Sequence, residues 1–125
     1  MSNASLTQVL TWLHQRHDQV MAEEQQAKDL LAGGDQGGYS QHMHRKAELL
    51  ASLAKDAREV LGTLPDENLR QEILRSLLRF SQSAAYGLKL DSLFFMSALL
   101  YRDDHQVGEP NNLLVYLQEL EAKHL

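Results

Sequence analysis

Apolar residues recur every three or four positions along most of this 125-residue chain, the spacing that lines one face of an α-helix. The pattern predicts helices at about 6–32, 39–61, 66–86 and 110–123. Glycines stand where the first three of these segments stop. We therefore expect a flexible turn over residues 33–38, a stop at Gly62 and an end or a bend at Gly87.

A fifth segment, 92–102, is apolar on every side rather than along one stripe. A buried strand would give the same pattern, but the chain offers no second strand to pair with it, so we expect a short buried helix. The predicted fold is all-α: an antiparallel bundle of four to five helices with an up-down core. Its short fourth helix must be buried by the others or by a second subunit. Residues 1–125 form a single domain in this interpretation, with 1–4 disordered or a cloning remnant.

Composition and charge narrow the possible functions. Apolar residues make up 43% of the chain, enough for a core, and there is no cysteine for disulfides or thiolate metal sites. The net charge is −5 without a cluster of Lys and Arg, so we expect no binding to nucleic acid. The longest apolar run, 93–101, is interrupted by Ser97 and is about half the length of a membrane span. With no visible secretory signal, these features predict a soluble, cytoplasmic protein that does not enter membranes.

Six histidines in so short a chain raise the possibility of a metal site. His14 and Asp18 are four residues apart and share one helix face, with His17 beside them. His44 and Glu48 have the same spacing on the second helix. Residues at this spacing can present two ligands to one ion, although the same spacing is common on solvated helix faces.

The expected hairpin of the first two helices keeps these two groups apart. If 33–38 fold the second helix back on the first, residues whose numbers sum to about 71 lie level. His17 and His44 are then about 15 Å apart along the bundle. Metal–nitrogen bonds are about 2 Å long, so one ion cannot use both. We expect no metal or cofactor. The alternative is a metal-binding bundle that uses His14, His17 and Asp18, completed across a dimer interface.

Two polar residues on the border of the first helix's apolar stripe, His17 and Glu24, are expected to meet other helices. The third helix should pass nearby. It would offer Arg75 to His17, and Ser81 or Gln82 to Glu24. Such contacts would make the two border residues structural.

The function predicted by elimination is protein–protein interaction. We expect no enzyme, because the chain has no nucleophile motif, phosphate-binding loop or dinucleotide fingerprint. A small acidic bundle suits an adaptor, a regulator or a chaperone-like protein with a protein partner that is unknown. The segment 83–101 predicts an apolar cleft bordered by Tyr86, Phe94, Phe95 and Tyr101. The first helix would be about 40 Å long, so a homodimer is also expected, with the second chain covering its far end.

Overall fold

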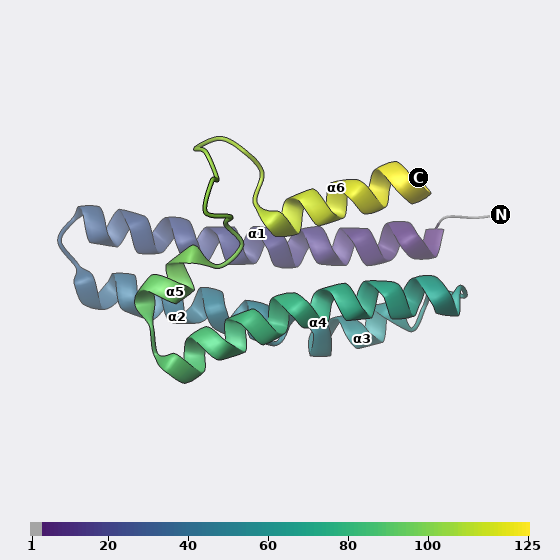
Figure 1. The fold of residues 1–125 in the computed structure, drawn as a ribbon, viewed down its shortest axis with the longest axis horizontal. Coiled ribbons are helices and arrows are strands. Elements are labelled where there is room, and N and C mark those ends of the chain that lie inside the picture. The colour runs from purple at the N-terminus through teal and green to yellow at the C-terminus, as the bar shows by residue number, and fades with distance from the viewer. Residues whose placement is uncertain (1–3) are drawn as a thin grey trace.

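A computed structural model describes residues 4–125 and shows a chain made of helices and connecting segments, without strands in that range (Figure 1). The helices pack against one another, which confirms the predicted all-α helical bundle. Their bounds are α1 Ala4–Ala32, α2 Gln36–Ala51, α3 Leu53–Leu61, α4 Glu67–Leu90, α5 Leu93–Ala98 and α6 Asn112–His124. The prediction for 1–4 concerns residues that lie outside the described part, except Ala4, which already belongs to α1.

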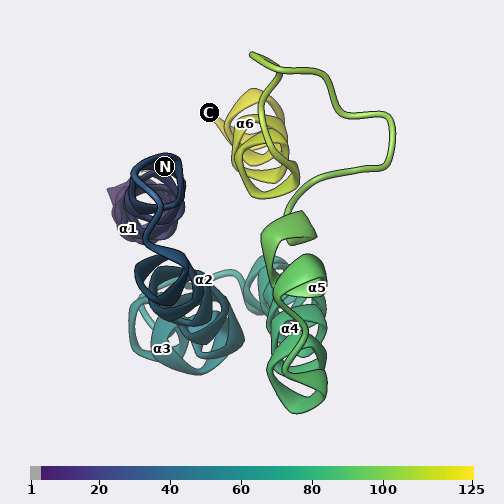
Figure 2. The same cartoon turned by 90° about the vertical axis from the view of Figure 1, so that its left-hand side faces the viewer.

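The long elements alternate in direction along the bundle. From the N-terminus, α1 runs the length of the molecule, α2 and α3 return in line beneath it, α4 runs back, and α6 returns again (Figure 1). Figure 2 views the bundle from its end and shows α1, α2–α3, α4 and α6 around a common centre. The start of α1 and the end of α6 therefore lie at the same end of the molecule (Figure 1). None of the helices formed by residues 4–125 combines the length and hydropathy that crossing a membrane requires.

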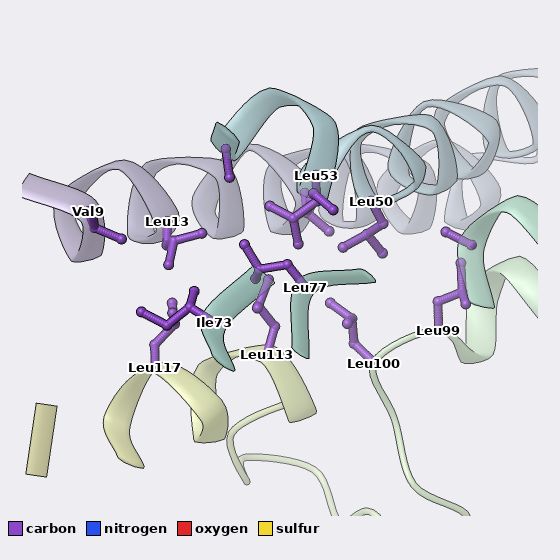
Figure 3. Close-up of a cluster of buried hydrophobic side chains, with 14 of the residues drawn as sticks. Val9, Leu13, Leu50, Leu53, Ile73, Leu77, Leu99, Leu100, Leu113 and Leu117 are labelled. Atoms are coloured by element: carbon purple, nitrogen blue, oxygen red, sulfur yellow. The ribbon is translucent and has the colours of Figure 1, made fainter. Parts of the chain in front are cut away.

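The core lies where these elements meet. Leu113 and Leu117 of α6 extend towards Ile73 and Leu77 of α4, and Leu13 of α1 approaches from the other side (Figure 3). All five side chains are fully buried. Burial of a leucine or isoleucine side chain stabilises a fold by about 1.5–3 kcal/mol. This cluster therefore contributes much of the free energy that holds α6 against α4 and α1.

The predicted second helix, 39–61, is two helices that meet at Ser52. In a continuous helix the Ala54 N–H would donate to the carbonyl of Leu50. Instead it donates to the Ser81 hydroxyl over 3.0 Å, and that hydroxyl donates to the Leu50 carbonyl over 2.9 Å. The break is thus caused by a side chain of α4 inserted into the hydrogen-bond ladder.

An arginine of α1 supports the same break from the opposite helix. The Arg16 guanidinium donates to the Leu49 carbonyl and to the Asp56 carboxylate, each over 2.9 Å. It also lies over the ring of Trp12, 5.0 Å from its centroid. Arg16 therefore joins the end of α2 to the start of α3 while its own position is held by α1.

The third helix does not end at Gly87, which was one of the two outcomes predicted there. α4 continues to Leu90 and closes at Asp91, which adopts the left-handed conformation with φ of 50°. Gly87 is needed inside the helix for a different reason. A Cβ at this position would lie 2.9 Å from the Phe95 ring, so glycine is what lets α5 pack closely against α4.

The predicted stop at Gly62 is confirmed, but the glycine-rich turn and the fourth helix are shorter than expected. α2 begins at Gln36 because the Asp35 side chain caps it, so the glycine-rich turn covers fewer residues than 33–38. α5 ends at Ala98, and Leu100 takes a φ of 75° that a helix cannot include. The expectation that this helix is buried all round is wrong as well. Phe94 is 84% exposed, and within α5 Met96 is the fully buried residue.

Candidate functional site

The structure directs the candidate metal ligands of α1 to different partners. The His14 ring bonds to the Glu121 carboxylate of α6, with 2.7 Å between Nε2 and Oε1. His17 lies next to Asp18, whose side chain is 79% exposed, at 3.1 Å. The rings of His14 and His17 therefore serve separate contacts.

Asn111, not Arg75, is the residue that faces His17. The Asn111 Oδ1 accepts from the Leu114 N–H and caps α6, so its amide NH₂ points at His17 Nε2, 2.9 Å away. Because an NH₂ can only donate, Nε2 must accept and Nδ1 carries the proton towards Asp18. Arg75 is exposed on α4, so the predicted contact with His17 is wrong.

His44 forms a contact between α2 and the end of α4. Its Nδ1 bonds to the Ser40 carbonyl and its Nε2 to the Asp91 carboxylate, each at 2.8 Å. The Ser40 carbonyl, followed by the Asp91 carboxylate, raises the pKa of His44, with a smaller contribution from the exposed Glu48. His44 thus bonds to α4 rather than sharing an ion with Glu48.

No three residues of a metal-binding type come together in the described range, 4–125, in a way that could hold an ion. His14, His17 and His44 instead bond to α6, to the segment before α6 and to Asp91 at the end of α4. Within one chain, these residues do not form the metal site of the alternative interpretation.

A buried ion pair that the sequence did not reveal lies between α1 and α2. The Lys46 ammonium, fully buried, donates to the Glu24 carboxylate over 2.8 Å and to the Ser97 carbonyl over 3.2 Å. The Tyr101 hydroxyl donates to the other oxygen of Glu24, and its ring lies 5.2 Å from the ammonium. The predicted partners of Glu24, Ser81 or Gln82, are wrong: Ser81 supports the α2–α3 break and Gln82 is exposed.

The electrostatics of this cluster follow from burial and charge together. Burial is the largest influence on the pKa of Glu24 and acts to raise it, but the Lys46 ammonium, the Tyr101 hydroxyl and Lys28 together outweigh burial, so the net pKa is lowered. Burial lowers the pKa of Lys46, and Glu24 offsets part of that change. Burial, with the nearby Glu24 carboxylate, raises the pKa of Tyr101. The phenol therefore stays protonated and acts as a donor to a carboxylate that stays charged.

This cluster lies beside an open groove of about 890 Å³ between α1, α2 and the segment that leads to α6. Glu24, His17 and Asn111 line its polar part, and Met21 and Met43 line its apolar part. The groove's buried polar groups already bond to one another. The arrangement ties the 99–111 segment to α1, since Tyr101 and Asn111 both belong to that segment.

The four predicted partner-binding aromatics divide into two kinds. Phe95 packs against Gly87 and makes an edge contact with Tyr86, at 5.5 Å between centroids, while Tyr101 belongs to the buried cluster. Tyr86 and Phe94 are exposed by 52% and 84%. Leu90, one turn after Tyr86 on α4, is 51% exposed and was not among the predicted residues. We call Tyr86, Leu90 and Phe94 the aromatic corner.

Comparison of the chain with protein-family models, with curated proteins and with solved structures gives no match. What the molecule does must therefore be argued from its own surfaces.

Proposed function

We propose that this chain is a cytoplasmic protein-binding module, of adaptor, regulator or chaperone-like type, and that its aromatic corner contacts the partner. The observation that carries the proposal is the 84% exposure of Phe94 on a capped helix. Exposed single apolar side chains are ordinary, but three large ones lie within residues 86–94, where α4 gives way to α5, and such a concentration favours an interface.

The corner is held in place by its own elements. The Ser92 hydroxyl accepts from the Phe95 N–H over 3.1 Å and fixes the start of α5, while Asp91 closes α4. Burying a phenylalanine side chain stabilises a contact by about 1.5–3 kcal/mol, and aromatic side chains on rigid elements often dominate interface energies. An apolar stripe of a partner helix is the chemistry that such a corner would recognise.

The test compares two substitutions of exposed apolar residues. Phe94→Ser removes the central side chain of the corner, and Val107→Ser removes a fully exposed side chain from the 99–111 segment as a control. Neither should change the free energy of unfolding by more than about 0.5 kcal/mol, because both residues are exposed. Pull-downs from the native organism should retain a partner with the unchanged chain and with Val107→Ser, and lose it with Phe94→Ser.

Equal capture by all three proteins would contradict the role of the corner. Light scattering over a concentration series separates another protein from a second copy of the chain as the partner. A dimer that dissociates in Phe94→Ser, but not in Val107→Ser, would identify the homodimer as the assembly formed through the corner.

A further inference from the structure

A second cleft, of about 360 Å³, lies between α4 and α6 beneath the segment that follows α5. Its polar lining comes from Ser76, Arg79 and Ser83 on α4 and from Asn112 and Tyr116 on α6. Ligand sites of folded proteins start at roughly 300 Å³, so this cleft has room for a small organic molecule. Below, it is called the α4–α6 cleft.

The hydroxyl of Tyr116 marks the inner part of this cleft. It is shielded from solvent and has no hydrogen-bond partner among residues 4–125, while the nearby Ser76 hydroxyl acts to lower its pKa. Leaving a buried hydroxyl without a partner costs about 1–3 kcal/mol. The Tyr116 ring is held by Phe80, with centroids 6.2 Å apart. A fold that keeps this cost beside an open cleft has a donor ready for a ligand oxygen.

Arg79 supplies a positive charge that the described residues leave without a carboxylate. It is exposed on α4, and no ion pair in the range 4–125 includes it. The positions three and four residues away on α4 hold Arg75, Ser76, Gln82 and Ser83, so no acid on its own helix face can neutralise it. A guanidinium without an ion-pair partner can donate two parallel hydrogen bonds to the two oxygens of a carboxylate.

The charges around the cleft select the type of anion. Burial is the main reason that the pKa of Tyr116 is raised, and Glu72 and Glu119 raise it further. The phenol is therefore a protonated donor at neutral pH, and two carboxylates lie close enough to oppose a second negative charge. A monoanion is favoured over a phosphate dianion, for which one guanidinium would be too little compensation.

The rest of the lining is apolar. Leu99 and Leu100 are buried and border the cleft together with Phe80. Leu100 is held in its left-handed conformation while its carbonyl accepts from the Asn112 N–H over 2.8 Å. The segment after α5 is thus fixed against the start of α6, and its two leucines offer a wall for a hydrocarbon group.

We propose that the α4–α6 cleft binds a small organic monocarboxylate. Arg79 and Tyr116 hold the carboxylate, and the apolar body of the ligand lies against Phe80, Leu99 and Leu100. This site is separate from the aromatic corner and does not depend on the proposed interaction function.

The experiment is a titration of the isotope-labelled protein with benzoate and with hexanoate, followed by amide NMR shifts. Saturable shifts are expected at Leu100, Asn112 and Tyr116. Arg79→Gln should weaken binding by about tenfold or more, and Tyr116→Phe, which removes only the hydroxyl, by several-fold. Arg75→Gln is the matched control, an exposed arginine one turn earlier on α4, and should bind like the unchanged protein.

Two analogues of benzoate complete the test, one without charge and one with a phosphate group in place of the carboxylate. Benzamide has the shape of benzoate without its charge and should bind much more weakly, and phenyl phosphate should bind no better than benzoate. The proposal is overturned if neither benzoate nor hexanoate gives saturable shifts at these residues. It is also overturned if Arg79→Gln binds as Arg75→Gln does, if benzamide equals benzoate, or if phenyl phosphate binds more tightly.

Discussion

At the scale of single residues, the histidines of α1 and α2 show why ligand-type residues on one helix face need not form a site. A metal requires side chains that converge on one point. Here His14 bonds to Glu121, His17 to Asn111, His42 to Glu23 and His44 to Asp91. Each ring therefore connects its helix to a different neighbour. The spacing of the histidines along the sequence does not show which neighbour each ring will bond to.

The buried Lys46 should be one of the most sensitive residues of the molecule. Lys46→Met removes the buried counter-charge of the Glu24 carboxylate and leaves only the exposed Lys28 nearby, and breaking a buried pair typically costs about 3–5 kcal/mol. Urea unfolding measures the loss. Lys28→Met, which removes an ammonium 3.5 Å from Glu24 that is 57% exposed, should cost less than about 1 kcal/mol.

A second substitution separates charge from packing in the same cluster. Adding Glu24→Gln to Lys46→Met removes the buried charge but keeps an oxygen to accept from Tyr101. The double variant should therefore be more stable than Lys46→Met alone. A double variant that is less stable by the sum of both single losses would mean that the charge pair is not what makes Lys46 important.

The contact between His44 and Asp91 should make stability depend on pH. The folded pKa of His44 is raised above its ordinary value of 6.5, so its contribution is fully present below that value. The contribution is lost as pH rises through the raised pKa. Asp91→Asn keeps a residue that tolerates the left-handed conformation but removes the charge, and it should cost under about 1 kcal/mol.

Urea unfolding at two pH values tests this sign. The difference between the unchanged protein and Asp91→Asn should be larger at about pH 5.5 than at about pH 8.5. Asp103→Asn, which changes an exposed acid in the 99–111 segment, should show no such trend. A difference that grows with rising pH would contradict the assigned role of Asp91.

At the scale of elements, the sequence predicted which segments are helical but not where packing interrupts them. The break at Ser52 depends on the Ser81 hydroxyl, which comes from a helix almost 30 residues further along the chain. Small and weakly polar residues, such as those at 81–87, are typical of a place where another element approaches closely. Their pattern cannot show that one of them inserts into the backbone ladder of α2–α3, because this depends on tertiary structure.

Ser81→Ala tests the importance of that insertion. Without the hydroxyl, the Ala54 N–H and the Leu50 carbonyl are buried without partners, at a cost of about 1–3 kcal/mol, or the two helices straighten to join them directly. Urea unfolding should show this loss, while Ser83→Ala, an exposed serine of the same helix, should stay within about 0.5 kcal/mol. Equal effects of the two substitutions would show that the inserted hydroxyl does not stabilise the break.

At the scale of the whole molecule, the helix register was predictable from the sequence, but the contacts made by the later segments were not. The Glu24–Lys46 and Arg16–Asp56 pairs have numbers that add up to 70 and 72, close to the predicted sum of about 71. That register alone would place Lys46 opposite Glu24, although a lysine normally suggests a solvated position. No such register predicts the position of Asn111, because Asn111 ends an irregular segment and the path of such a segment does not follow from any periodicity in the sequence.

The predicted homodimer rested on the length of α1, and the structure removes that reason without testing the assembly. α2 and α3 lie in line along α1, and α6 covers α1 near its start (Figure 1). Buried residues of α1 extend from Leu6 to Ala27 within a single chain. A second chain is therefore not needed to cover this helix, and a homodimer would have to use another surface, of which the aromatic corner is the exposed apolar candidate.

The least stable part of the molecule should be α6 together with the segment that leads to it. The segment 99–111 is mostly exposed, and Asn111 joins it to α1 through His17 while capping α6. Asn111→Ala removes a helix cap, worth about 1 kcal/mol, and leaves the buried His17 Nε2 without its donor. Native-state hydrogen exchange should show loss of protection in α6, with smaller changes in α2 and α4.

Asn112→Ala is the control for this prediction, because the neighbouring side chain makes no hydrogen bond within residues 4–125 and is not the cap. Its α6 amides should exchange almost as in the unchanged protein. If Asn111→Ala instead lowers protection equally in every helix, α6 unfolds only with the whole bundle. The cap, the His17 contact and the core leucines Leu113 and Leu117 would then belong to one cooperative unit.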